Sequence, residues 1–135
     1  MSARTNLVLQ SSVVAVVAVV RLAQPGWLLI IFVMSLVGPV LLIHHIGVTR
    51  TAVRRERLPE RLATPFVLAA AGLLVGNLLL ADYTDGSRYA SPLELVTGPL
   101  PDDLQAAGEL MLVGWVLCLV WVTIELHRTE RRTSD

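Results

Sequence analysis

The spacing of the charged residues is the feature that most constrains this chain. Only 16% of its 135 residues are charged, and four stretches contain none of them: 5–20, 22–49, 62–81 and 110–124. A helix that crosses the roughly 30 Å hydrocarbon core of a bilayer needs about 20 mostly apolar residues. Hydrophobic residues make up 54% of the chain and the mean hydropathy is +0.65, so too few polar side chains remain to cover a soluble globule. The pattern predicts an integral membrane protein.

We expect an all-α fold, a bundle of four transmembrane helices that forms a single domain over residues 1–135. The spans are placed at about 6–23, 27–48, 64–81 and 106–126, because a spanning segment must satisfy its own backbone groups in lipid. The pair Pro25-Gly26 predicts a tight turn between the first two spans. An alternative is that residues 1–24 form a cleaved signal peptide, although Arg21 stands where the small residues of a cleavage site are expected.

Arginines orient the expected bundle. All 11 basic residues are arginine, which indicates a GC-rich genome, and most of them lie before the first span, in the loop 49–63 and in the tail 127–135. The loop 82–105 carries mainly carboxylates. Because arginine-rich segments stay in the cytoplasm, we expect both termini and the loop 49–63 to be cytoplasmic, and the loop 82–105 to lie outside. The expected location is the cytoplasmic (inner) membrane of a prokaryote.

Small residues recur along the expected spans. In lipid, helices associate where small side chains let two backbones approach closely. Gly72 and Gly76 form a GxxxG motif that follows Ala69, and Gly114 and Cys118 lie one turn apart in the fourth span. These residues predict helix packing, either within the bundle or between two copies of the chain.

The second span contains Gly38 and Pro39, which predict a kink. Proline lacks the amide that would bond the carbonyl of Ser35. Ser35 and Asn77 are also among the few polar residues at depth, so they are candidates for a polar path through the membrane. Asn77 is alternatively an interhelical hydrogen-bonding group.

His44 and His45 end the second span and are weak candidates for binding a haem or a metal. Neighbouring helical residues point about 100° apart, so both cannot easily face one centre. Anchoring at the membrane interface is the alternative, and we expect neither a metal site nor a cofactor.

Polar residues expected on the outer side support two further predictions. Ser91 and Glu94 form a capping-box pattern that predicts a short helix in the outer loop. Arg21, Asp82 and Glu109 end three different spans and are positioned to pair across the bundle. Such interface pairs contribute little individually, about 0–1 kcal/mol.

The sequence contains no catalytic triad, phosphate loop, dinucleotide fingerprint or CxxC pair, and its net charge is zero. We therefore expect neither an enzyme nor a nucleic-acid-binding protein. The expected role is association, as an accessory subunit of a membrane complex or as a homo-oligomer that uses its small-residue helix faces, with membrane lipid around it. Two alternatives remain open: a channel or transporter with a path between protomers, and a haem- or metal-binding membrane anchor of a redox complex.

Overall fold

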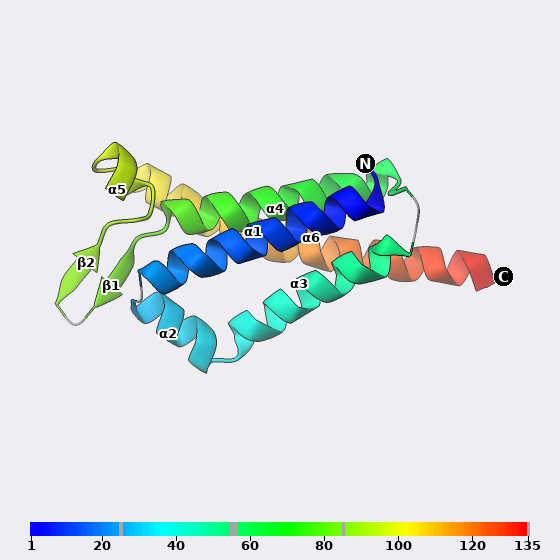
Figure 1. The fold of residues 1–135 in the computed structure, drawn as a ribbon, viewed down its shortest axis with the longest axis horizontal. Helices are drawn as coiled ribbons and strands as arrows, with labels where there is room; N and C mark the ends of the chain where they lie inside the picture. Colours follow the sequence, from blue (N-terminus) through cyan, green and yellow to red (C-terminus); the bar gives the residue numbers. More distant parts are fainter. Residues whose placement is uncertain (25, 55–56, 85, 135) are drawn as a thin grey trace.

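The structure is a computed structural model that describes residues 1–24, 26–54, 57–84 and 86–134. The described residues form helices α1 (Ala3–Ala23), α2 (Trp27–Met34), α3 (Val37–Val53), α4 (Glu60–Leu79), α5 (Glu94–Thr97) and α6 (Asp102–Ser134), together with strands β1 (Asp82–Thr84) and β2 (Ser87–Tyr89) (Figure 1). The architecture is helical, as expected, apart from one short antiparallel hairpin.

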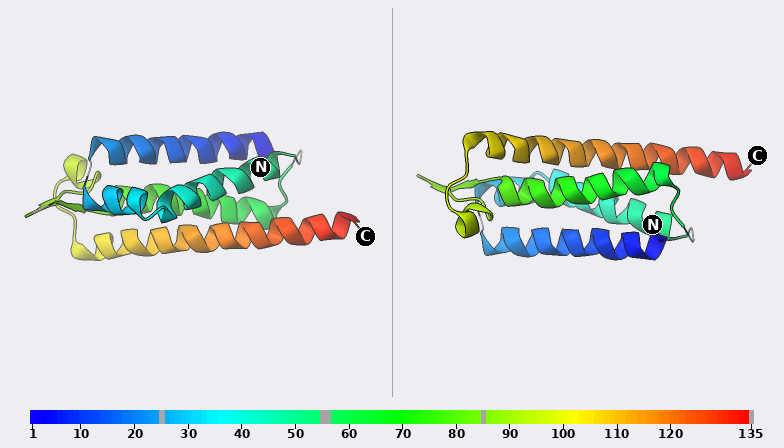
Figure 2. Two further views of the ribbon diagram at one scale, coloured as in Figure 1. Left: turned by 90° about the horizontal axis from the view of Figure 1, so that it is seen from below. Right: turned by 90° about the horizontal axis from the view of Figure 1, so that it is seen from above.

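Helix α4 lies at the centre of the bundle. It packs along α6 and against α1, while α3 contacts both α1 and α6. Figure 2 shows α1 and α6 on opposite sides, with α3 and α4 between them. Both chain ends lie at one end of the bundle, and the hairpin and α5 lie at the other (Figure 1).

Three helices, α1, α4 and α6, are long and apolar enough to cross a membrane. The pair α2 and α3 passes the same test together, so the described residues hold up to four spans if this bent pair counts as one. The prediction of a helical fold with several apolar helices of membrane-spanning length is therefore confirmed.

The expected second span, 27–48, is not one helix. The axes of α2 and α3 differ by 72° across a break between Met34 and Val37. Leu36 lies in this break with φ of 61°, a left-handed conformation that is unfavourable for a residue with a Cβ atom. The chain therefore bends much more than a proline kink would require.

The break also changes the role of the residues predicted to make the kink. Because α3 begins at Val37, Pro39 lies in the first helical turn, where backbone amides have no intrahelical acceptor. A Cβ atom at Gly38 would overlap the ring of Phe32, so Gly38 lets α2 fold back close to α3.

The segments on either side of the last span also differ from the expectation. Helix α6 begins before residue 106, at Asp102, and continues to Ser134 through most of the expected tail. The outer loop contains the unpredicted hairpin, in which Tyr83 pairs with Arg88.

The contact between α4 and α6 depends on three glycines. A Cβ atom at Gly72 would lie 2.7 Å from the carbonyl oxygen of Met111, and one at Gly76 would lie 3.0 Å from that of Gly108. A Cβ atom at Gly108 would in turn lie 2.9 Å from Cβ of Leu79. The GxxxG motif therefore packs inside the bundle, where the glycines bring the two helix backbones together.

Candidate functional site: a buried polar network and an apolar cavity

The most distinctive group of polar side chains lies in the middle of the bundle. Gln10 of α1 is fully buried, and its Nε2 donates to Oδ1 of Asn6 at 3.0 Å and to the carbonyl oxygen of Phe66 in α4 at 2.9 Å. Its Oε1 lies 2.8 Å from Nε2 of His45 in α3. Every polar atom of the Gln10 amide therefore has a partner on α1, α3 or α4.

His45 connects this group to the fourth long helix. Nε1 of Trp115 in α6 donates to Nδ1 of His45 at 2.9 Å. An indole nitrogen can only donate, so Nδ1 accepts and the imidazole proton is on Nε2, which donates to Gln10. His45 is consequently a neutral imidazole with both nitrogens engaged. The chain of donors runs from Trp115 through His45 and Gln10 to Asn6 and the Phe66 carbonyl.

One atom of this network is not satisfied. Nδ2 of Asn6 is buried and has no hydrogen-bond partner among the described residues. Rotating the Asn6 amide would place two donors face to face, since its Oδ1 already accepts from Gln10. The network therefore joins four helices but ends at Asn6 with one unpaired donor.

A cavity of about 360 Å³ lies beside this network. Its wall is almost entirely apolar and comes from α1, α2, α3, α4 and α6. Residues that line it include Val17, Phe32, Pro39, Leu42, Leu73, Leu112 and Trp115. The indole of Trp115 belongs to both features, because it lines the cavity and donates to His45. Helix α2 contributes Phe32 and three other residues to the wall, although it has no buried residue.

Arg21 and Asn77 provide the polar groups of the cavity wall. Nε of Arg21 donates to Oδ1 of Asn77 at 2.9 Å, and its NH2 group donates to the carbonyl oxygens of Asn77 and Leu80. Arg21 NH1 lies 3.9 Å from Oδ2 of Asp82, which is an ion pair without a hydrogen bond. The two charged side chains are 9% and 3% exposed. Arg21 thus ties the end of α1 to the end of α4.

The carboxylate of Asp82 also holds the start of α2. Its Oδ1 accepts from the backbone amide of Leu28 at 2.9 Å and from its neighbour Tyr83 at 2.7 Å. Its Oδ2 is buried and has no hydrogen-bond partner among the described residues. A Cβ atom at Gly26 would overlap this carboxylate. Gly26 therefore lets Asp82 reach the first turn of α2.

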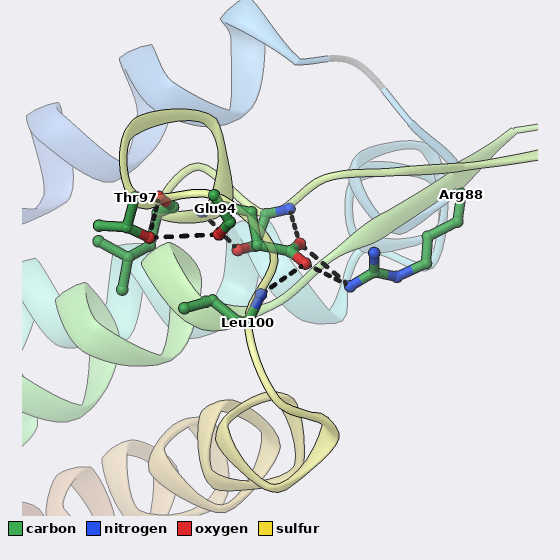
Figure 3. A network of polar contacts seen from close by, with 7 residues as sticks. Arg88, Glu94, Thr97 and Leu100 are labelled. Carbon is green, nitrogen blue, oxygen red and sulfur yellow. Dashed lines mark hydrogen bonds and ion pairs between the residues drawn. The ribbon is translucent and has the colours of Figure 1, made fainter.

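A second polar network lies in the outer loop (Figure 3). Ser91 and Glu94 exchange the hydrogen bonds of the predicted capping box, with Ser91 N to Glu94 Oε2 at 2.6 Å and Glu94 N to Ser91 Oγ at 3.2 Å. Arg88 NH2 contacts both oxygens of Glu94, at 2.9 and 3.0 Å, and the amide of Leu100 lies 3.3 Å from Oε1. The Ser91 amide and then Arg88 lower the pKa of Glu94 from 4.5 to about 2.

The weak cofactor candidates are engaged elsewhere. His45 has no free ring nitrogen, as described above. Oγ1 of Thr123 donates to the carbonyl of Leu119, so Nε2 of His44 donates to Thr123 at 2.8 Å. Within the described part of the chain, no three His, Cys, Asp or Glu side chains are grouped closely enough to hold a metal ion. The structure does not bring His44 and His45 to one centre.

The remaining predicted site residues are spread over the bundle. Ala69 is fully buried, whereas a Cβ atom at Gly114 would meet nothing within 4 Å, and Cys118 is half-buried. Ser35 is exposed at the helix break and lies 3.4 Å from the carbonyl of Phe32. Ser35 is not among the residues that line the cavity with Asn77.

The predicted pairing of Arg21, Asp82 and Glu109 is found in part. Arg21 lies near Asp82, but Glu109 is exposed and belongs to none of the described ion pairs. The sequence analysis assigned no role to Gln10, Asn6 or Trp115. The contact between Asn6 and Gln10 had a sequence signal, because two polar residues four positions apart share one helix face.

Comparisons of the chain with known protein families, with curated proteins and with solved structures give no match.

Proposed function

We propose that this chain is a four-span protein of a prokaryotic cytoplasmic membrane, with both termini in the cytoplasm, and that it acts by association rather than by catalysis. The separation of charge along the bundle supports the orientation. The start of α1, the start of α4 and the last part of α6 lie at one end of the bundle, and the hairpin, α5 and the start of α6 lie at the other (Figure 1). The first group of segments carries Arg4, Arg61 and Arg128, with Arg57 bridged to Ser2, and the second carries Asp82, Glu94 and Asp102. Arginines of this kind stay on the cytoplasmic side.

The distribution of the buried polar groups supports a non-catalytic role. Gln10 and His45 use their side-chain polar atoms in contacts between helices, and Arg21 joins α1 to α4. A nucleophile or a general base needs a polar atom that is free to meet substrate. The side chains of Gln10, His45 and Arg21 hold the helices together instead.

The proposal of association rests on the exposed apolar face of α6. Leu110, Val113 and Leu117 on this helix are 57–72% exposed, and Trp121 is 48% exposed. Gly114 lies on the same helix with no atom within 4 Å of its Cβ position, whereas Gly108 of α6 packs against α4. Glycine weakens a helix by roughly 0.5–1 kcal/mol relative to alanine. Glycine on a helix surface in lipid is typical of a contact with another helix. We therefore infer that a partner helix, from a second copy or from another membrane protein, packs at Gly114.

A pair of matched variants tests this proposal. Gly114→Leu should break up the assembly isolated in mild detergent, measured as apparent mass and as the set of co-purified proteins. Gly47→Leu is the control, because Gly47 is also helical with nothing within 4 Å of its Cβ position. An assembly that survives Gly114→Leu as well as it survives Gly47→Leu would remove the α6 face from consideration. Cross-linking of Cys118 in native membranes then distinguishes a second copy from a different partner.

A further inference from the structure

We propose that α5 inserts into the lipid headgroup region of the outer leaflet and that Leu95 and Val96 contact lipid there. This inference rests on the proposed four-span placement in a membrane, and it does not depend on the α6 interface. It starts from the depth at which α5 is held, from the pairing of the charges around it and from the exposure of its apolar side chains.

Helix α5 is held at the level where α4 ends. The backbone amide of Leu93, the residue before α5, donates to the carbonyl oxygen of Leu78 at 3.0 Å, and Leu78 lies in the last turn of α4. Helix α5 has four residues that rise about 1.5 Å each, so all of them lie within about 6 Å of Leu93 along its axis. Each headgroup region is about 5–8 Å thick, because a bilayer of about 40–45 Å contains a hydrocarbon core of roughly 30 Å. With α4 as a span, α5 therefore lies among the headgroups rather than in the water beyond them.

A charged side chain on α6 marks the same boundary. A Cβ atom at Gly108 would lie 2.9 Å from Cβ of Leu79, the last residue of α4, so the next residue, Glu109, is at the level where α4 ends. Glu109 is exposed and belongs to none of the described ion pairs. An exposed carboxylate is costly in hydrocarbon but not among hydrated headgroups. The hydrocarbon core should therefore end near this level, which is also the level of α5.

The charges around α5 are paired with each other. Arg88 and Glu94 are the only charged residues of the segment 86–101, and Arg88 NH2 lies 2.9 and 3.0 Å from the two carboxylate oxygens of Glu94 (Figure 3). The backbone amides of residues 95–98 all donate to carbonyl oxygens of residues 91–94, at 2.9–3.2 Å. Insertion of α5 therefore takes neither an unpaired charge nor a free backbone amide of these residues out of water.

The exposed side chains of this region suit a lipid surface. Leu95 is 66% and Val96 is 84% exposed, and the hairpin next to α5 exposes Tyr83 and Tyr89. Tyrosine is enriched at membrane–water interfaces, where its ring meets apolar groups and its hydroxyl group meets water. Two aliphatic side chains supply much less than the roughly 800 Å² that each partner buries in a typical protein interface. The boundary between headgroups and acyl chains accepts a small apolar surface of this kind, since interfacial helices bury their apolar residues there.

Fluorescent labels measure the depth of α5. The experiment uses the full chain in phosphatidylcholine nanodiscs, with its single cysteine replaced by Cys118→Ala and the fluorophore NBD attached at Leu95→Cys or Val96→Cys. Val19→Cys is the lipid reference, since Val19 is 66% exposed on α1, and Asp103→Cys is the water reference, since Asp103 is exposed at the start of α6. At both α5 sites, NBD emission should be blue-shifted from that of the water reference and less quenched by iodide. Phosphatidylcholine brominated near the glycerol end of its chains should quench both α5 labels more than lipid brominated near the methyl end.

A matched pair of variants tests whether the apolar side chains hold α5 in the lipid. With the label at Leu95, Val96→Asp should increase quenching by iodide, because a carboxylate favours water over lipid. Val96→Leu keeps the side chain apolar and should leave the quenching unchanged. Circular dichroism verifies that both variants remain helical. Equal quenching by iodide in the two variants would show that Val96 does not contact lipid.

The remaining outcomes would overturn the proposal in distinguishable ways. Iodide quenching of the α5 labels as strong as that of the water reference, with the Val19 label still quenched by brominated lipid, would place α5 in water. The four-span placement would then stand without this inference. Protection of the α5 labels from both iodide and brominated lipid would mean that protein covers Leu95 and Val96. A Val19 label that brominated lipid does not quench would remove the membrane placement itself, and this inference with it.

Discussion

Trp115 and His45 are joined by a 2.9 Å hydrogen bond from the indole Nε1 to the imidazole Nδ1, which links α6 to α3. The ring centroids are 6.1 Å apart and the planes are tilted by 37°, so the contact is a hydrogen bond rather than a stacked pair. Because this bond leaves the imidazole proton on Nε2, it also sets the direction of the bond from His45 to Gln10. One indole thereby orders the whole buried network.

Removing the indole donor of Trp115 should destabilise the bundle. Trp115→Phe leaves Nδ1 of His45 buried without a partner, which should lower the free energy of unfolding by about 1–2 kcal/mol. Unfolding by sodium dodecyl sulfate in mixed micelles, followed by circular dichroism, measures the change. Trp121→Phe is the matched control on the same helix, since Trp121 is 48% exposed. Equal losses in the two variants would contradict the assigned role of the hydrogen bond.

Gly72 and Gly76 should respond differently to alanine. At Gly72 the new methyl group would lie 2.7 Å from the Met111 carbonyl, a backbone atom that cannot move alone. At Gly76 its nearest neighbour is the flexible Leu112 side chain, at 2.8 Å. Gly72→Ala should therefore cost about 1–3 kcal/mol and Gly76→Ala should cost less. The same unfolding assay tests the order. Gly47→Ala is the control and should be neutral or stabilising, because nothing lies within 4 Å.

Replacing Leu36 by glycine should increase the stability of the fold. Its φ of 61° is unfavourable for leucine and open to glycine, and its side chain is 67% exposed. Leu36→Gly should raise stability by up to about 1 kcal/mol without changing the bend. Leu110→Gly should instead lower stability by roughly 0.5–1 kcal/mol, since Leu110 is equally exposed but helical. A loss in both variants would show that the left-handed conformation at Leu36 carries no strain.

The outer capping box should depend on pH only in strong acid. The Ser91 amide and Arg88 lower the pKa of Glu94 from 4.5 to about 2. A carboxyl group with a lowered folded-state pKa stabilises the fold above its unfolded pKa, and this contribution is lost as pH falls toward the folded value. The contribution of Glu94 should thus be complete above about pH 4.5 and disappear toward about pH 2. The NMR shift of the Ser91 amide should follow this transition, with a midpoint near 2, and should be flat in Glu94→Gln.

The sequence predicted the parts of the fold that depend on composition. The four stretches without charged residues identified the apolar helices. A long apolar segment in lipid forms a helix because it must satisfy its own backbone hydrogen bonds. The capping box was also predictable, since Ser91 and Glu94 are three residues apart and their hydrogen bonds are local. The hairpin had a sequence signal that was not used, because the dipeptide Asp-Gly at 85–86 favours hairpin formation.

The bend and the site could not be predicted in the same way. Leu36 carries no mark of a left-handed residue, which is usually glycine or asparagine. Pro39 suits both a kinked helix and the first turn of a new one. Gln10 and His45 were visible as polar residues, but their bond joins helices 35 residues apart in sequence, and the bond of His45 to Trp115 spans 70. Pairing over such separations depends on how the helices rotate against each other, which apolar periodicity in lipid does not fix.

Gly26 and Asp82 should behave as one unit in the attachment of α2. A methyl group at Gly26 would overlap the Asp82 carboxylate and displace it from the Leu28 amide. Gly26→Ala should lower stability by about 1 kcal/mol, as the loss of a helix cap does. Asp82→Ala should lower it further, because it removes the same contact and also leaves the buried Arg21 without its ion-pair partner. Because the Leu28 contact is already lost in Asp82→Ala, the double variant should lose about as much as Asp82→Ala alone rather than the sum of the two losses. A double-mutant cycle in the unfolding assay measures the coupling. Additive losses would mean that Gly26 acts through something other than the Asp82 carboxylate.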